Sequence, residues 1–379
     1  MTTLPYREHH ILQILESYEQ QHLPLDLFIS KWFRANKALG SKDRGVIAET
    51  IYTLIRWMGL IDHLCEKPVT WKQRLAVFEN FHYADHLDKK EIPQHVRLSF
   101  PKVLYELIVN THGEAKAHEL CLISNTIAPT TVRANAMKIG RNELLNRWKD
   151  AYSVKSCKHA ANGITFIKKI NLFGLPEFKE GCFEVQDEGS QLLAELVAAE
   201  PGQQVMDYCS GSGGKTLAFA PLMGNKGQIF LHDIRPHALE EARKRLRRAG
   251  IQNAQIIKSD NEVNLKKLKK KMDWVLVDAP CTGTGTMRRN PDMKWSFTAE
   301  TLTRLVGQQR TIFEKALSFM HPKGKIIYGT CSLLKEENEE QIAHFMKTYK
   351  LKLVGEPFQT LPTEGGMDGF YGAVFEYQQ

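Results

Sequence analysis

The sequence predicts an α/β protein, in which a C-terminal parallel sheet follows an all-helical region and a small α+β unit. Three observations predict this fold class. Apolar residues recur at helical spacing through about the first 125 residues. From about residue 200, short apolar runs alternate with helical segments, which is typical of a parallel sheet with helices on both faces. Several of these runs end on an acid or a thiol, at the edge where such sheets bind ligands.

We expect more than one domain, because a chain of 379 residues exceeds one ordinary hydrophobic core. Changes in pattern place a helical domain over residues 1–125, a small α+β unit over residues 126–182 and the α/β domain over residues 183–379. The sequence shows no internal repeat and no low-complexity linker.

The N-terminal region predicts consecutive amphipathic helices. Apolar positions at helical spacing mark helices near residues 11–18, 25–33 and 47–58. Pro24 suits the start of the second helix, and Gly40-Ser41 suits the end of that helix and the cap of the next. We expect the apolar stripes of these helices to form the core of a bundle.

The pattern changes near residue 127. Strands are predicted over residues 130–135 and 164–167, with a helix over residues 143–148 between them. A helix over residues 190–199 leads into the α/β domain. There the run Trp274–Val277 is almost wholly apolar, which suits a strand that is buried on both faces of a parallel sheet.

The predicted strands of the α/β domain end on polar or reactive side chains. Four acids and one thiol occupy these positions: Asp207, Asp233, Asp260, Asp278 and Cys331. A single aspartate at a strand end is common, so each residue alone says little. Because the carboxyl ends of parallel strands meet at the ligand-binding edge of the sheet, the series predicts a site there.

Composition limits the classes of protein to consider. Apolar residues make up 42% and charged residues 25%, as in a soluble globular protein, and no apolar run approaches a membrane span. The N-terminus lacks a signal-peptide pattern, so we expect a cytoplasmic protein. Seven cysteines without a C-x-x-C pair predict reduced thiols, with no disulfide framework and no metal site. The net charge of +8 fits a polyanionic partner without establishing one.

A glycine-rich loop between a predicted strand and helix, Asp207–Thr216, can bind three kinds of ligand. Gly214-Lys215-Thr216 matches the end of a P-loop, but that motif needs glycine where this chain has Cys209. A dinucleotide motif would need three glycines at its spacing, and the loop supplies two. S-adenosylmethionine is the third ligand, and an acid that ends the next strand, here Asp233, would bind its ribose. The loop alone favours methyl transfer only slightly.

Two thiols at ligand-facing strand ends, Cys281 and Cys331, favour methyl transfer to a pyrimidine. C5 of a pyrimidine is too weak a nucleophile to attack a sulfonium methyl, but a thiolate added to C6 places electron density on C5. The adduct must then lose its C5 proton and expel the thiol, so a second group has to assist as a base. Neither a P-loop ATPase nor a dehydrogenase needs two such thiols. We expect four other cysteines to be small buried hydrophobes: Cys65, Cys121, Cys157 and Cys182.

Two longer motifs carry a family resemblance. VDAPCTGTGTMRRNPDMKW (277–295) and YGTCSLLKEENEEQI (328–342) resemble the cysteine motifs of RNA (cytosine-5)-methyltransferases of the Sun/Fmu type. FEVQDEGSQL (183–192) and DGFYGAVF (368–375) resemble the beginning and the closing strands of their catalytic domain. LGSKDRGVIAETIYTLIR (39–56) resembles their NusB-like helical region. The resemblance covers most of the chain and implies a Rossmann-like, S-adenosylmethionine-dependent methyltransferase domain behind RNA-binding domains.

The resemblance also implies roles for single residues. Cys331 is the nucleophile, Cys281 assists elimination, and Asp278 contacts the cofactor and the pyrimidine edge. The cofactor contacts carry over to Cys209, Ser210, Gly211, Ser212, Gly213, Gly214, Lys215, Asp233, Asp260 and Asp278. The expected partner is RNA, either rRNA or tRNA, and we expect a monomer without a metal.

The glycine-rich loop departs from the family's usual C-A-A-P-G-G-K, because Ser210-Gly211-Ser212 replaces A-A-P. Without the proline the unbound loop is less rigid. Glycine in place of alanine keeps the close approach of the backbone. The departure therefore bears on the affinity for the cofactor more than on its identity.

Three basic segments and two other function classes complete the expectations. Arg243–Arg248 ends a helix before Gly250 and is predicted to be a solvated face, whereas Lys266–Lys271 fits a solvated face or an RNA contact equally. Arg288-Arg289-Asn290 follows the Cys281 loop and is predicted to contact phosphate or base. An RNA-binding assembly factor with an inactive methyltransferase domain stays open as an alternative, and a P-loop ATPase is the less favoured one.

Overall fold

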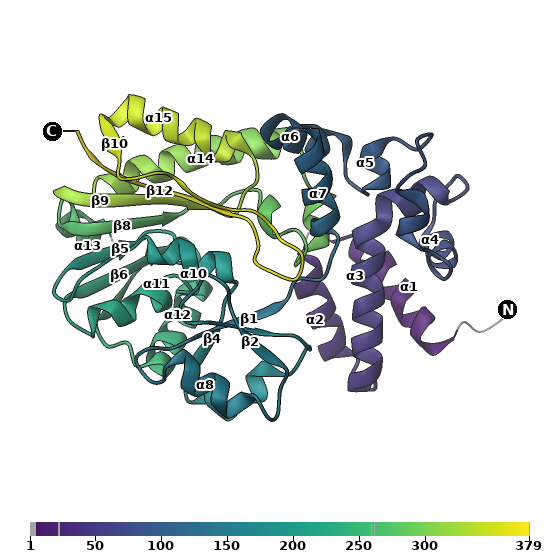
Figure 1. The fold of residues 1–379 in the computed structure, drawn as a ribbon, viewed down its shortest axis with the longest axis horizontal. Helices are drawn as coiled ribbons and strands as arrows, with labels where there is room; N and C mark the ends of the chain where they lie inside the picture. Colours follow the sequence, from purple (N-terminus) through teal and green to yellow (C-terminus); the bar gives the residue numbers. More distant parts are fainter. Residues whose placement is uncertain (1–4, 22, 259, 261, 379) are drawn as a thin grey trace. The chain divides into compact units, whose positions relative to one another are not determined.

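The chain divides into two compact units in the computed structural model (Figure 1). Unit 1 comprises residues 1–127 and 286–299, and unit 2 comprises residues 128–285 and 300–379. Within these limits the structure describes residues 5–21, 23–258, 260 and 262–378. Among the described residues, no helix is both long enough and apolar enough to cross a membrane.

Unit 1 is helical, as the apolar spacing predicts. Its helices are α1 (Tyr6–Glu19), α2 (Leu25–Ala35), α3 (Ser41–Leu64), α4 (Trp71–Phe78), α5 (Gln94–Arg97), α6 (Lys102–His112) and α7 (Glu114–Ser124). The apolar stripe of α3, which includes the fully buried Ile51 and Leu54, packs in one core with the buried faces of α1 and α2. In Figure 1 the long helix α3 runs beside α1. The periodic pattern was sufficient for α1 and α2, because their buried residues recur at helical spacing.

A segment of the chain that lies far along the sequence, residues 286–299, also belongs to unit 1. Lys294 is buried there, and its ammonium group donates to the carbonyl oxygen of Arg56 at 2.6 Å and to Oδ1 of Asn125 at 2.7 Å. Burial holds the pKa of Lys294 well below its usual value. Unit 1 therefore includes the second half of the Cys281 motif, whereas the sequence predicts a helical domain from residues 1–125 alone.

The small sheet of unit 2 is antiparallel and has the strand order β2-β3-β1-β4. Its elements are β1 (Thr130–Ala134), α8 (Arg141–Trp148), β2 (Val154–Ser156), β3 (Gly163–Phe166), α9 (Pro176–Lys179) and β4 (Phe183–Val185). Trp148 of α8 packs on the rings of Phe166 and Phe183, which belong to the two strands on either side of β1. Because β4 lies beyond residue 182, the small sheet extends into the predicted α/β domain.

The large sheet confirms the predicted α/β fold. Its strand order is β10-β12-β9-β8-β5-β6-β7, and β11 pairs with β12. The strands are β5 (Gln204–Asp207), β6 (Gln228–Asp233), β7 (Ala254–Lys258), β8 (Met272–Asp278), β9 (Met320–Thr330), β10 (Leu351–Leu353), β11 (Phe358–Thr360) and β12 (Phe370–Tyr377). The five strands from β5 to β9 are parallel, and the three closing strands pair antiparallel. The helices of this domain are α10 (Glu188–Glu195), α11 (Thr216–Phe219), α12 (Pro236–Ala249), α13 (Glu262–Leu268), α14 (Ala299–Leu317) and α15 (Glu339–Tyr349).

Strand β8 has apolar side chains on both faces, and this explains its nearly continuous apolar run. Val275 and Val277 belong to the core with α14 and α15, whereas Trp274 and Leu276 belong to the core with α11 and α12. Parallel pairing aligns Asp207 of β5 with Leu276, so the carboxyl ends of these strands lie at one edge of the sheet. The predicted site residues are gathered at this edge.

Candidate functional site

The carboxyl ends of the central strands carry the predicted acids. Asp207 and Asp233 end β5 and β6 and are buried, and Asp278 ends β8 with its side chain 32% exposed. Asp260 differs from them, because it lies in a turn beyond the end of β7 and is exposed. Residues 259 and 261 on either side of it lie outside the described residues. Three of the four acids therefore lie together at one edge of the large sheet, and Asp260 lies at the periphery of that edge.

The glycine-rich loop (residues 208–215) connects β5 to α11. Gly211 and Gly213 adopt φ values of +54° and +77°, in the left-handed region that favours glycine. A Cβ atom on Gly213 would lie 3.4 Å from side chains of Leu231 and Ala242, whereas one on Gly214 would meet open space. The backbone N–H of Ser210 donates to the carbonyl oxygen of His232 at 3.0 Å and ties the loop to β6. Gly211 and Gly213 thus let the loop backbone turn tightly over the strand ends.

Asp233 fixes the loop from the neighbouring strand. Its Oδ2 accepts from the backbone N–H of Gly211 at 2.8 Å and from Arg235 Nη2 at 3.0 Å. Its Oδ1 accepts from the backbone N–H and the Nε of Arg235, both at 2.9 Å. Burial alone would raise the pKa of Asp233, but the bonds from Arg235 and Gly211 outweigh burial and lower it. A carboxylate has about four lone-pair sites, so these four bonds fill the acceptor capacity of Asp233.

Asp207 lies beneath the loop and is wholly buried. Its Oδ2 accepts from the hydroxyl of Thr216 at 2.7 Å, and its Oδ1 has no hydrogen-bond partner. Burial raises the pKa of Asp207 to about 7, although the Thr216 bond opposes the rise. The hydroxyl of Ser210 is likewise buried without a partner. Native proteins rarely leave such groups unpaired, so they indicate a ligand at this place.

Lys215, at the end of the loop, forms an ion pair with Oδ2 of Asp278. Burial lowers the pKa of Lys215, but the adjacent carboxylate of Asp278 more than offsets this effect, and the net pKa is raised. The negative charge of a Cys331 thiolate acts in the same direction. The buried ammonium group therefore interacts with both the acid and the predicted nucleophile.

The two thiols of the predicted site lie side by side. The Sγ atoms of Cys281 and Cys331 are 3.4 Å apart, and the backbone N–H of Cys331 donates to Cys281 Sγ at 3.4 Å. The hydrogen bond with Cys331 and burial raise the pKa of Cys281 well above its usual value. Cys281 therefore remains a protonated thiol at neutral pH. Fifty residues of sequence separate the two positions, and parallel pairing of β8 with β9 brings them together.

A buried carboxylate holds the Cys281 loop, and the sequence reasoning missed it. Glu337 is fully buried, and its Oε1 accepts from the backbone N–H of Thr282 and from Gln309 Nε2, both at 2.9 Å. Its Oε2 accepts from the Thr282 hydroxyl at 2.5 Å. Glu337 stands in the acidic run Lys335–Glu340, where nothing distinguishes it from solvated acids. The only available signal was its place in the second cysteine motif.

The remaining cysteines fit the expectation of small buried hydrophobes. Cys65, Cys121, Cys157 and Cys182 are all buried. Burial raises the pKa of Cys121 to about 12 and that of Cys157 to about 11. Within the described ranges, no group of three or more His, Cys, Asp or Glu side chains is arranged to hold a metal ion.

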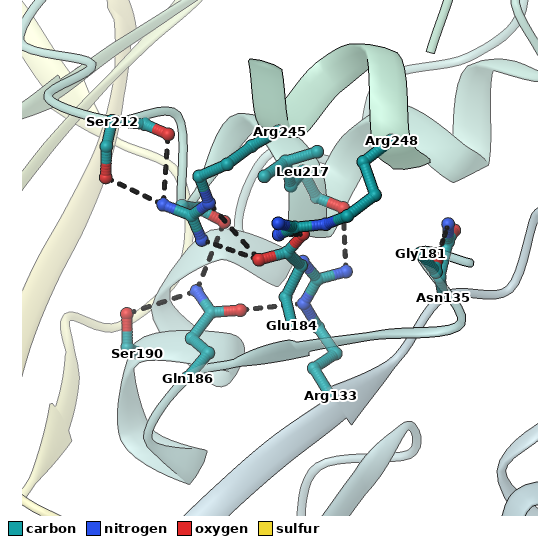
Figure 2. A network of polar contacts seen from close by, with 11 residues as sticks. Arg133, Asn135, Gly181, Glu184, Gln186, Ser190, Ser212, Leu217, Arg245 and Arg248 are labelled. Carbon is teal, nitrogen blue, oxygen red and sulfur yellow. Dashed lines mark hydrogen bonds and ion pairs between the residues drawn. The ribbon is translucent and has the colours of Figure 1, made fainter. Parts of the chain in front are cut away.

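The basic run on α12 is only partly a solvated face. Arg243 and Lys244 are exposed and pair with Glu240 and Glu241 on their own helix. Arg245 and Arg248 instead turn inward, and Figure 2 shows both guanidinium groups directed at Glu184. The prediction of a solvated face is therefore wrong for these two arginines, because residues three positions apart on a helix share one face, and this face of α12 is directed at Glu184.

Arg288, which was predicted to contact phosphate or base, is buried in the structure, with only 2% of its surface exposed. Its carbonyl oxygen accepts from Arg56 Nη2 at 2.8 Å, within unit 1. The following Arg289 is partly exposed. Burial of Arg288 argues against a contact of that side chain with RNA.

Comparison with known proteins identifies the family of this domain. The family described as 16S rRNA methyltransferase RsmB/F matches residues 194–376. A probable ribosomal RNA small subunit methyltransferase B of Synechocystis sp. is 30% identical over 282 residues, which are 74% of this chain and 63% of the relative. The ribosomal RNA small subunit methyltransferase B of Vibrio vulnificus is 32% identical over 263 residues, which are 67% of this chain and 61% of the relative. The chain thus spans less than two thirds of the length of these relatives.

Solved structures agree on the fold. The solved structure of PH0851 aligns with 99% of this chain and with 99% of its own chain, with a TM-score of 0.83 and 21% sequence identity. A methyltransferase homolog protein from Pyrococcus horikoshii covers 75% of this chain and 97% of its own, with a TM-score of 0.66 and 26% identity. The domain at residues 194–376 is therefore identified as one of the family described as 16S rRNA methyltransferase RsmB/F.

Proposed function

We propose that this protein transfers a methyl group from S-adenosylmethionine to C5 of a cytidine in RNA, through a covalent adduct between Cys331 and C6 of the base. The observation that carries the proposal is the pair of thiols, with Sγ atoms 3.4 Å apart, at the ends of β8 and β9. The names of the curated relatives favour ribosomal RNA of the small subunit as the substrate.

The residues around the glycine-rich loop fit the cofactor. A Cβ atom on Gly214 would meet open space, and the Ser210 hydroxyl in the loop has no hydrogen-bond partner, so a ligand can approach the loop here. Asp233 ends the second strand, where a carboxylate can accept from ribose hydroxyls. S-adenosylmethionine, when bound, supplies an electrophilic methyl group on a sulfonium centre. We assign the loop residues from Cys209 to Lys215, with Asp233 and Asp278, to its binding, and Asp260 to the periphery of the site.

Cys331 supplies the nucleophile in this proposal. Its thiolate forms a bond to C6 of the cytosine, and the electron pair of the C5–C6 double bond then becomes available at C5 to accept the methyl group. Lys215 is the cation that we assign to the activation of this thiol, and its ion pair with Asp278 holds it in place. Asp278, which is fixed by Lys215 and partly exposed, can present its second oxygen to the pyrimidine edge.

Cys281 is suited to assist release. Its raised pKa keeps it protonated, so its S–H can donate to the Cys331 sulfur at the 3.4 Å separation. When solvent water takes the C5 proton, the electron pair of the C5–H bond re-forms the C5–C6 double bond, and the bond from Cys331 to C6 breaks with its electron pair returning to sulfur. A hydrogen-bond donor to the departing sulfur lowers the barrier to that step.

The alternatives lack this support. In a P-loop the lysine reaches phosphate groups at the start of a long helix, whereas here Lys215 binds Asp278 and α11 has only four residues. A relic domain in an assembly factor would have no reason to keep both thiols, the ion pair and the buried Glu337 in place.

Methylation of defined RNA tests the proposal. The protein is incubated with labelled S-adenosylmethionine and either small-subunit rRNA or a tRNA pool, and 5-methylcytosine is then mapped by sequencing. We expect label at C5 of a cytidine in the rRNA and none with Cys331→Ala. Label in tRNA alone would change the substrate class. Label at another atom, or absence of S-adenosylmethionine binding, would contradict the proposal.

A further inference from the structure

The inward-facing arginine of α12, Arg245, binds the glycine-rich loop directly. Its Nη1 donates to the carbonyl oxygen of Ser212 at 3.0 Å and to the Ser212 hydroxyl at 2.7 Å. The other side of the same guanidinium donates to Oε2 of Glu184, from Nη2 at 3.0 Å and from Nε at 3.2 Å. Figure 2 shows Arg245 reaching both partners, with Ser212 on one side and Glu184 on the other. A single side chain therefore connects the loop to strand β4 of the small sheet.

Glu184 is itself held in place. Its side chain is only 5% exposed, and its second oxygen, Oε1, accepts from Arg248 Nη2 at 2.5 Å. The guanidinium carbon of Arg248 lies 4.0 Å from the centre of the Phe178 ring, which fixes this second arginine as well. A carboxylate with bonds at both oxygens and little exposure has one available orientation, so it gives Arg245 a rigid support.

Two more side chains from the small sheet and the segment after it reach the loop and the helix that follows. Gln186 Nε2 lies 3.4 Å from the carbonyl oxygen of Gly214, and Arg133 Nη1 donates to the carbonyl oxygen of Leu217 at 2.7 Å. Gln186 and Arg133 are also joined to each other, at 2.7 Å (Figure 2). The segment from residue 212 to residue 217 is thus contacted at three points, by Arg245 of α12, by Gln186 just after β4 and by Arg133 of β1.

The place of the Ser212 contact in the loop matters. Ser212 stands between Gly211 and Gly213, both of which have positive φ. Glycine has the widest choice of backbone conformations, so a loop with two such residues samples many shapes unless something else fixes it. It is also the position where the loop lacks the proline of its family pattern. Arg245 is the side chain that binds both the backbone and the hydroxyl at that position.

We propose that Arg245 and Glu184 are positioning residues for the cofactor: they hold the glycine-rich loop in the shape that binds S-adenosylmethionine. The proposal rests on the cofactor assigned under the proposed function. Apparent affinity falls in proportion to the fraction of molecules that hold the competent conformation. We call Arg245 and Glu184, with the contacts of Arg245 to Ser212, the clamp. Loss of the clamp therefore weakens binding of the cofactor without removing any atom that touches the cofactor.

The affinity of the 379-residue chain for S-adenosylmethionine, measured by calorimetry, tests the role of the clamp. Arg245→Ala should bind S-adenosylmethionine about tenfold more weakly, as expected for the loss of charge-assisted hydrogen bonds. Ser212→Ala removes only the hydroxyl contact and should have a smaller effect. The matched control is Arg243→Ala, which removes the same charge from an exposed position on the same helix and should bind like the parent.

The conservative variant Arg245→Lys separates positioning from loss of charge. A lysine keeps the charge, but it lacks the planar fork that reaches Ser212 and Glu184 together. We expect it to restore part of the affinity. Combining Arg245→Ala with Ser212→Ala should cost less than the sum of the two single effects, because both variants remove the same contact.

Hydrogen exchange read by mass spectrometry adds a readout that does not depend on the cofactor. Amides of the glycine-rich loop should exchange faster in Arg245→Ala, whereas those of β8 and β9 should be unchanged. A purely structural ion pair would instead lower the thermal stability of the whole unit and leave the affinity of the folded protein unaltered.

The outcomes distinguish the two proposals. Parent-like affinity and parent-like loop exchange in Arg245→Ala would overturn the clamp and leave the proposed function standing. Failure of the parent protein to bind S-adenosylmethionine would overturn the proposed function, and the clamp with it.

Discussion

Replacement of the buried Asp207 by asparagine should make the protein more stable at neutral pH and remove a pH dependence. The pKa of Asp207 is raised from 3.8 to about 7, because burial disfavours its charged form. Asparagine has nearly the same shape and can still accept the Thr216 hydroxyl bond of 2.7 Å. The substitution therefore removes the ionisation and leaves the packing in place.

The sign and size follow from proton binding. Between pH 4 and pH 7 the folded protein keeps a proton on Asp207 and the unfolded chain does not, so stability falls as pH rises. The stability contributed by the protonated Asp207 is fully present below the pKa of the unfolded chain, and it is lost as pH rises through about 7. Each pKa unit corresponds to about 1.4 kcal/mol and Asp207 is half ionised at pH 7, so the parent should lose about 2 kcal/mol between pH 5 and pH 7 relative to Asp207→Asn.

Urea unfolding at pH 5, 6, 7 and 8, followed by circular dichroism, measures this difference. The difference between the unfolding free energies of Asp207→Asn and the parent should widen up to pH 7 and level off above pH 8. Asp150→Asn, an exposed aspartate in the same unit, is the control and should follow the parent at every pH. Parallel curves for Asp207→Asn and the parent would refute the reasoning that burial sets the pKa of Asp207.

Three further predictions concern ligand binding. Asp233→Ala should weaken S-adenosylmethionine binding by about 1.5–3 kcal/mol, the usual range for losing hydrogen bonds to a charged acceptor; unchanged affinity in calorimetry would remove Asp233 from the ribose role. Arg235→Ala should strengthen S-adenosylmethionine binding by up to about fivefold, because the side chain of Arg235 occupies acceptor sites of Asp233. Arg235 is half-exposed, so little net energy is lost when its ion pair is removed. Weaker binding of the cofactor would make Arg235 part of the cofactor site. RNA binding should weaken steeply from low to physiological salt in filter assays, and a flat dependence would argue against a basic docking surface.

Much of the fold and of the site could be predicted because the relevant signals are local. A strand that is buried on both faces needs a continuous apolar run, and β8 has one in Trp274–Val277. The reactive side chains Asp278, Cys281 and Cys331 stand directly after such runs. Parallel pairing of the strands then brings them to one edge without further information.

Other features depend on contacts between distant parts of the sequence. Arg245 and Arg248 look like solvated charges in a basic run, and their partner Glu184 lies more than 60 residues away. Glu337 is one acid among several until its bonds to Thr282 are known. Lys294 belongs to the Cys281 motif in sequence, yet it is buried in unit 1. Charge alone does not reveal which of these side chains turns inward.

The most direct test of the account is a denaturing gel of the two thiol variants, each incubated with substrate RNA and S-adenosylmethionine. Cys281→Ala keeps the nucleophile and loses the group that assists release, so the protein should accumulate as a complex with RNA that survives denaturation. Cys331→Ala has no nucleophile and should give neither the complex nor methylated RNA. A trapped complex with Cys331→Ala and none with Cys281→Ala would reverse the two roles. Full activity in both variants without any trapped RNA would contradict the covalent mechanism itself.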